Sequence, residues 1–127
     1  MPVRSLRSCV RTWPDARSVD AAVRAWAREM AKQRLEVVRM GYFGSYARGD
    51  WGVGSDVDLI VVVRESKVPF VRRAAEWDTT TLPVPADVLV YTQEEWSSPG
   101  LQERFGRVAE QVVWVFERRE GGCRRNR

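Results

Sequence analysis

The stretch from residue 41 to residue 63 constrains the fold more than any other part of this 127-residue chain. Its last five residues, 59–63, are all aliphatic and do not alternate with polar residues. Such a run is typical of a strand that is buried on both faces of a sheet. Asp56 and Asp58 come just before it, and side chains alternate along a strand, so both carboxylates should lie on one face. The stretch therefore predicts a rigid central strand, over residues 58–63, that carries a pair of acids.

Gly44 and Ser45 follow an earlier apolar run, which we expect to be a strand over residues 37–43. Gly44 lets a ligand approach the backbone closely, and Ser45 offers a hydroxyl group and an N-cap for a short helix over residues 45–49. The first amides of such a helix would point at phosphate oxygens. A glycine-serine turn and an Asp-x-Asp pair are each common in ordinary turns. Their order and spacing together indicate a site for a nucleoside triphosphate.

Carboxylate oxygens are the ligands that hard divalent cations prefer, and two carboxylates can share a pair of ions about 4 Å apart. The chain contains no histidine, which excludes Ser-His and Cys-His nucleophiles and the usual zinc sites. Cys9 and Cys123 lie near opposite ends and have no metal-ligand spacing. Acid–base and metal chemistry should therefore fall on carboxylates.

The motif formed by Gly44-Ser45, Gly49 and the run Ser55-Asp56-Val57-Asp58-Leu59 resembles the signature of the polymerase-β-like nucleotidyltransferase superfamily. The chain is similar to the minimal nucleotidyltransferases of that superfamily over roughly residues 18–117. The resemblance implies an α/β fold with a mixed sheet of about four strands and flanking helices. It also implies nucleotidyl transfer from ATP with magnesium, two ions being expected.

The resemblance further implies a third carboxylate on a later strand, and Asp87 stands at that place, near the start of a strand expected over residues 86–91. This acid would complete the second ion site or take the proton of the acceptor hydroxyl. The residues expected to be catalytic and to bind metal are Asp56, Asp58 and Asp87. Those expected to bind the nucleotide are Gly44, Ser45, Arg48 and Ser55, although the sequence alone favours an ordinary solvent-exposed arginine at position 48 over a phosphate contact.

No residue identifies the acceptor. In the family, minimal nucleotidyltransferases often act as antitoxins beside a small all-helical ribonuclease toxin, and some transfer AMP to a tyrosine of that toxin. The resemblance therefore implies a protein acceptor and such a partner. Two alternatives stay open: a binding module that neutralises its partner by contact, and a transferase that acts on a small molecule or an RNA end. The net charge of +4 does not choose among ATP, RNA and an acidic protein, so nucleic acid is a partner that is not favoured.

The remaining patterns predict one domain over residues 1–127 and a cytoplasmic protein, because no signal-like or membrane-spanning apolar run is present. Ser18 is the expected N-cap of a helix over residues 19–33, and a capping box at residues 92–95 opens a turn over residues 93–97. Trp51 is expected to stack on a nucleotide or a partner, or else to anchor its loop. The other expected elements are helices over 69–79 and 98–110, mainly on one side of the sheet, a last strand over 112–116, an edge strand near 9–13 and a flexible tail over 118–127.

Overall fold

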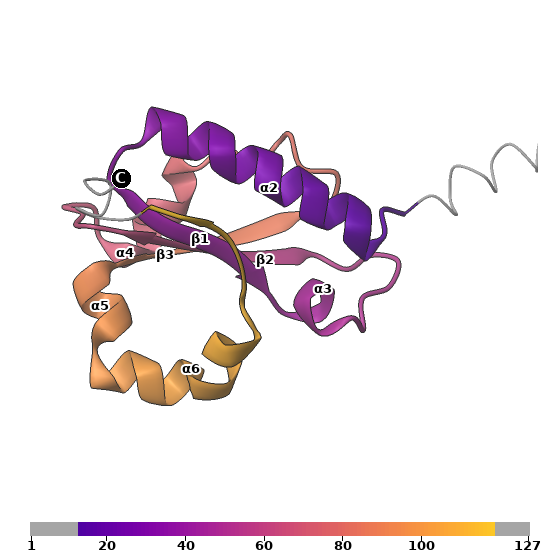
Figure 1. Ribbon diagram of the computed structural model, residues 1–127. Coiled ribbons are helices and arrows are strands. Elements are labelled where there is room, and N and C mark those ends of the chain that lie inside the picture. The colour runs from indigo at the N-terminus through magenta and orange to yellow at the C-terminus, as the bar shows by residue number, and fades with distance from the viewer. Residues whose placement is uncertain (1–12, 119–127) are drawn as a thin grey trace, which may run out of the picture.

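Four strands form one mixed sheet in the computed structural model, which describes residues 13–118 (Figure 1). In the order β3-β2-β1-β4 across the sheet, they are β3 (Ala86–Thr92), β2 (Val57–Val63), β1 (Val37–Phe43) and β4 (Val113–Glu117). Strand β1 pairs antiparallel with β2 and with β4, and β2 pairs in parallel with β3. The four strands predicted within these residues are confirmed, with ends that differ by no more than about one residue.

Helices cover both faces of this sheet. Helix α2 (Ala16–Gln33) lies on one face, and α5 (Gln93–Ser97) and α6 (Pro99–Gln111) lie on the opposite face (Figure 1). The expectation that helices pack mainly on one side is therefore wrong. Its physical reason lies in β2: Leu59 and Val61 join the core under α2, whereas Ile60 and Val62 are equally buried on the other face and need a cover of their own.

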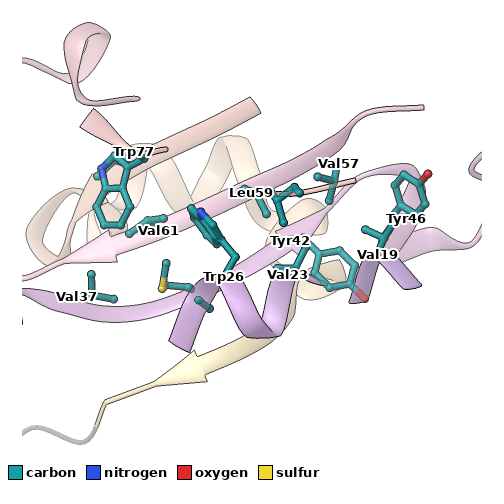
Figure 2. Packing of buried hydrophobic residues seen from close by; sticks show 14 of the residues in the cluster. Val19, Val23, Trp26, Val37, Tyr42, Tyr46, Val57, Leu59, Val61 and Trp77 are labelled. Carbon is teal, nitrogen blue, oxygen red and sulfur yellow. The ribbon is translucent and has the colours of Figure 1, made fainter. Parts of the chain in front are cut away.

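The main core lies between α2 and the sheet (Figure 2). Trp26 of α2 is 4% exposed, and its indole N–H donates a hydrogen bond of 2.7 Å to the carbonyl of Asp78. The valines and other apolar residues that surround it come from α2, β1 and β2. They include Val19, Val23, Ala27, Val37, Met40, Tyr42, Val57, Leu59, Val61 and Val63.

Helix α2 begins at Ala16, earlier than predicted, because Asp15 and not Ser18 is its N-cap. The Asp15 carboxylate accepts a hydrogen bond of 2.9 Å from the backbone amide of Ser18. This bond also lowers the pKa of Asp15. A carboxylate cap satisfies an amide that the first helical turn leaves without a partner.

The helix predicted over residues 69–79 is shorter in the structure. Helix α4 (Phe70–Arg73) is followed by the 3-10 turn η1 (Ala74–Glu76), and the backbone of Trp77 is extended. Trp77 is 6% exposed and meets Trp26 at a ring-centroid distance of 6.3 Å. The chain therefore leaves the helix at the residue whose indole is buried against Trp26.

Two predicted segments fall partly or wholly outside the described residues. Residues 9–12 of the expected edge strand lie outside them, and Trp13 belongs to no strand. Arg118, expected to open a flexible tail, is held by the core: its guanidinium donates to the carbonyls of Val37 and Ala31 at 2.9 and 3.0 Å. Residues 119–127 also lie outside the described range. No helix within residues 13–118 is long and apolar enough to cross a membrane.

A buried arginine joins α4 to β3 and α5 on the second face. Arg73 donates to both carboxylate oxygens of Glu95, at 2.7 and 3.1 Å, and to the carbonyl of Val90 at 3.0 Å. Glu95 also accepts a 2.9 Å hydrogen bond from the amide of Thr92, which completes the predicted capping box of α5. One carboxylate therefore both caps a helix and neutralises a buried cation.

We expect Glu95→Gln to lower the free energy of unfolding by about 1 kcal/mol at pH 7, because the Glu95 side chain is partly exposed to solvent. The hydrogen bond from Arg73 holds the pKa of Glu95 below its usual 4.5. A depressed pKa means that this stabilisation is present above about pH 4.5 and is lost as the pH falls through the folded-state pKa.

Urea unfolding of parent and variant across a pH series measures this difference. The gap should be widest near neutral pH and should close in acid. Glu94→Gln, a change at the exposed neighbouring position, is the matched control and should match the parent. A gap that stays constant down to pH 3 would contradict the assignment.

Candidate active site

Two of the predicted acids lie side by side. Asp58 of β2 is the register partner of Asp87 in the parallel strand β3, and Phe43, the last residue of β1, lies on its other side. These three residues line a pocket of about 460 Å³. Asp56 is exposed and comes just before β2. The sheet therefore brings together acids that are far apart in the sequence.

Gly44 touches the carboxylate of Asp58. Its φ of +85° and ψ of −152° belong to a backbone region that is essentially restricted to glycine. A Cβ atom at this position would collide with Oδ2 of Asp58. Both the backbone angle and the contact require glycine, so the turn and the acid are built as one unit.

The helix after this turn, α3 (Ser45–Arg48), is short. Gly44 is its N-cap, without a side-chain hydrogen bond, so the expectation that Ser45 is the N-cap is wrong. The carbonyl of Gly44 accepts from the amides of Ala47 and Arg48 at 3.0 and 2.9 Å. Gly49, with a φ of +92°, ends the helix. The Ser45 hydroxyl therefore has no capping role in α3.

Mutual repulsion links the three acids. Partial burial raises the pKa of Asp58, and the negative charges of Asp87 and Asp56 raise it further. Arg48 acts in the opposite direction. Three other predicted site residues are therefore close enough to influence the ionisation of Asp58. Because two of the three are acids, the cluster carries net negative charge.

Arg48 and Ser55 already have partners within the loop region. Nε of Arg48 lies 3.2 Å from Oδ2 of Asp50, and both side chains are exposed. The Ser55 hydroxyl accepts a hydrogen bond of 2.8 Å from the amide of Gly52. These contacts show Ser55 as a residue that shapes its loop. A role in nucleotide binding remains a prediction for both residues.

Asp56, Asp58 and Asp87 offer carboxylate oxygens as metal ligands, and oxygen ligands suit a hard cation such as magnesium. Asp58 and Asp87 are adjacent, which fits a shared cation. Within residues 13–118, however, no three acidic, cysteine or histidine side chains are gathered into one ready-made metal site. The oxygen ligands therefore fit magnesium. The structure places Asp58 beside Asp87, but it does not gather Asp56 with them into a three-ligand site.

Trp51 anchors its loop. Its ring stacks on that of Tyr46, with a centroid distance of 5.5 Å and an angle of 10° between the planes. Of the two expectations for this residue, the loop anchor is the one that the structure shows. Tyr46 is not among the residues predicted from the sequence, although a large aromatic directly after the Gly44-Ser45 turn is a signal for such an anchor.

A larger pocket lies elsewhere, with a volume of about 1050 Å³. Phe70, Tyr91, Leu101 and Arg104 are among its lining residues. It lies at the ends of β2 and β3 that are remote from Asp58 and Asp87, and it shares no lining residue with the carboxylate pocket. Size alone therefore does not locate the chemistry, and the converging acids are the better guide.

We expect Gly44→Ala to lower the free energy of unfolding by about 1–3 kcal/mol, the usual cost of placing a side chain in this backbone region. The contact with Asp58 adds to that cost. Gly52→Ala is the matched control, because Gly52 has no positive φ and a Cβ atom added there would meet no atom within 4 Å. Chemical denaturation of both variants measures the difference, and equal stability would contradict the close packing of turn and acid.

We expect Asp58→Asn to leave the metal-free protein as stable as the parent at pH 7, or to stabilise it. The raised pKa of Asp58 means that its charged form opposes folding, so this cost is present at neutral pH and is relieved as the pH falls toward the ordinary value of 3.8. Thermal unfolding in EDTA at several pH values measures the effect. A lower midpoint at pH 7 than that of the parent would contradict the repulsion.

Several solved structures share this fold, among them the following two. One is a candidate nucleotidyltransferase from Sulfolobus solfataricus, with 19% identity over 81% of this chain and 84% of that chain and a TM-score of 0.60. The other is a toxin–antitoxin structure with AMP-PNP, with 15% identity over 76% of this chain and 74% of that chain and a TM-score of 0.52. No curated protein sequence gives a significant match. At these identities the structural likeness establishes the fold, a mixed sheet with flanking helices.

A sequence model of the nucleotidyltransferase domain matches residues 24–115. This range is most of the chain, and it contains the Gly44-Ser45 turn and the acids Asp56, Asp58 and Asp87. The resemblance seen in the sequence is confirmed at this level, and the chain belongs to the nucleotidyltransferase domain family.

Proposed function

We propose that the protein transfers AMP from ATP to a hydroxyl group of a protein partner, with Asp56, Asp58 and Asp87 as its catalytic acids. The observation that carries the proposal is the register of Asp58 and Asp87, with the carboxylate of Asp58 packed against Gly44. This arrangement sets Asp58 directly beside the glycine-serine turn, with Asp87 next to it on β3. Membership of the nucleotidyltransferase domain family supplies the class of reaction.

The turn and α3 supply the donors for the triphosphate. Gly44 has no side chain to block the backbone, and the Ser45 hydroxyl has no capping role in α3, so both suit contacts to the β- and γ-phosphates. Arg48 is near enough to lower the pKa of Asp58, and a guanidinium at that place would offset phosphate charge. Asp50 competes for the same arginine.

Magnesium, as two ions held by Asp56, Asp58 and Asp87, would neutralise the charge of the triphosphate and of the clustered acids. The acceptor oxygen then attacks the α-phosphorus, a new P–O bond forms, and the bond to the β-phosphate breaks to release pyrophosphate. Asp87 is exposed, so it faces the side from which an acceptor arrives. It completes the cation site or takes the proton that the acceptor hydroxyl loses.

The acceptor that we propose is a tyrosine of a small all-helical toxin, which makes this chain an antitoxin. Support comes from the structural neighbour, a toxin–antitoxin structure that contains AMP-PNP. The exposed site and the exposed loop around it leave room for a macromolecular acceptor.

The test is a label-transfer assay from α-labelled ATP, run with magnesium, to the product of the neighbouring gene if that gene encodes a small helical protein. We expect Asp58→Asn and Asp87→Asn each to reduce transfer by at least about 100-fold, the usual scale for losing one electrostatic contributor. Asp87→Asn should keep more ATP affinity, because its proposed role lies on the acceptor side. Glu110→Gln, at an exposed position of α6, is the control and should transfer like the parent.

Two outcomes would redirect the proposal. If the Asp58 and Asp87 variants transfer label like the parent, the acids are not catalytic. If no label moves but every variant still silences the partner and co-elutes with it, neutralisation by contact is the better account. Label that appears on RNA or on a small molecule, and not on the partner, would change the acceptor class alone.

A further inference from the structure

We propose that the stacked rings of Tyr46 and Trp51 are a positioning element, which fixes the spacing between the Gly44-Ser45 turn and Asp56 at the end of the loop that leads into β2. In this proposal neither ring contacts the nucleotide. The inference rests on the proposed ATP site and deepens it, because it names residues that set the geometry of that site from behind.

Tyr46 fixes one side of this element. It directly follows Ser45 in α3, it is 4% exposed, and its ring lies at the end of the core with Val19 and Val57 (Figure 2). Its hydroxyl accepts a hydrogen bond of 2.9 Å from the indole of Trp13 and donates one of 3.2 Å to the carbonyl of Pro14. The turn is thereby tied to the chain segment that enters α2.

Trp51 fixes the other side. It belongs to the loop over residues 49–56, which runs from the end of α3 to the start of β2. Gly49 and Gly54 in this loop have positive φ angles of 92° and 91°. The near-parallel stack of Trp51 on Tyr46, at 5.5 Å, holds the middle of the loop against the core.

The loop needs such a hold. Three of its residues are glycines, at positions 49, 52 and 54, and glycine has the largest backbone freedom to lose on ordering. The loop ends at Asp56, which is exposed, and Asp58 follows within β2. Because displacements of about 1 Å can cost a reaction about 100-fold, the stack controls how well the phosphate turn and the acids match one ligand.

The experiment compares Trp51→Ala with the conservative Trp51→Phe, and with Val53→Ala as a control at an exposed position of the same loop. Two readouts are taken: amide hydrogen exchange of residues 49–57 without nucleotide, and KM and kcat for ATP with magnesium in label transfer. We expect Trp51→Ala to exchange faster over the loop and to raise KM about tenfold, the scale of a lost aromatic pair. Trp51→Phe should restore most of both, and Val53→Ala should match the parent.

Tyr46→Phe separates anchoring from stacking, because it keeps the ring and removes the bonds to Trp13 and Pro14. It should lower the thermal midpoint while leaving loop exchange closer to the parent than Trp51→Ala does. Loop exchange and KM within twofold of the parent in Trp51→Ala would overturn the inference. Faster loop exchange in Trp51→Ala, combined with a parent protein that neither binds nor transfers ATP, would support the hold on the loop and refute the proposed function.

Discussion

The parallel pairing of β2 with β3 is the contact on which the candidate site depends. In that register, Asp58 meets Asp87, and the antiparallel pairing of β1 places Phe43 on the other side of Asp58. Burial raises the pKa of Asp58, and the like charges of Asp87 and Asp56 raise it further, so the ionised carboxylate is held here at a cost in free energy. The sheet holds these acids together, because β2 is buried on both faces and is paired with β1 on one side and β3 on the other. The pairing of the strands thus keeps Asp58 and Asp87 together against the repulsion between their charges.

The same contact explains the glycine-serine turn. Gly44 adopts a backbone conformation restricted to glycine, and the space where its Cβ would lie is filled by the Asp58 carboxylate. A turn that closes this tightly over an acid leaves backbone amides and a charge cluster at one place. A metal-bound triphosphate is a ligand that could satisfy both, since its cations pair with the acids and its oxygens with the amides.

The strands and their acids were predictable from the sequence because the signals are local. The aliphatic run of β2, the Asp-x-Asp pair and the capping box of α5 each lie within a few residues of one another. The early start of α2, the end of η1 at Trp77 and the stack of Tyr46 on Trp51 were not predicted. The Asp15 cap of α2 is a local signal that sequence reasoning missed, since it lies three residues before Ser18. The end of η1 depends on a partner chosen by the tertiary fold, because Trp77 packs against Trp26. The second covered face follows the same rule, because an unbroken apolar run shows that a strand is buried without showing what buries it.

The most direct measurement of the central claim is the thermal midpoint of the parent protein with magnesium alone, with ATP alone and with both. If the acids and the turn form one site, the two ligands must stabilise the fold together, because the nucleotide brings phosphate to the turn and the cation brings charge to the acids. The predicted result is a clear rise in midpoint only when both are present, and its loss in Asp58→Asn. A folded protein whose midpoint does not move at millimolar concentrations of both ligands would contradict the account.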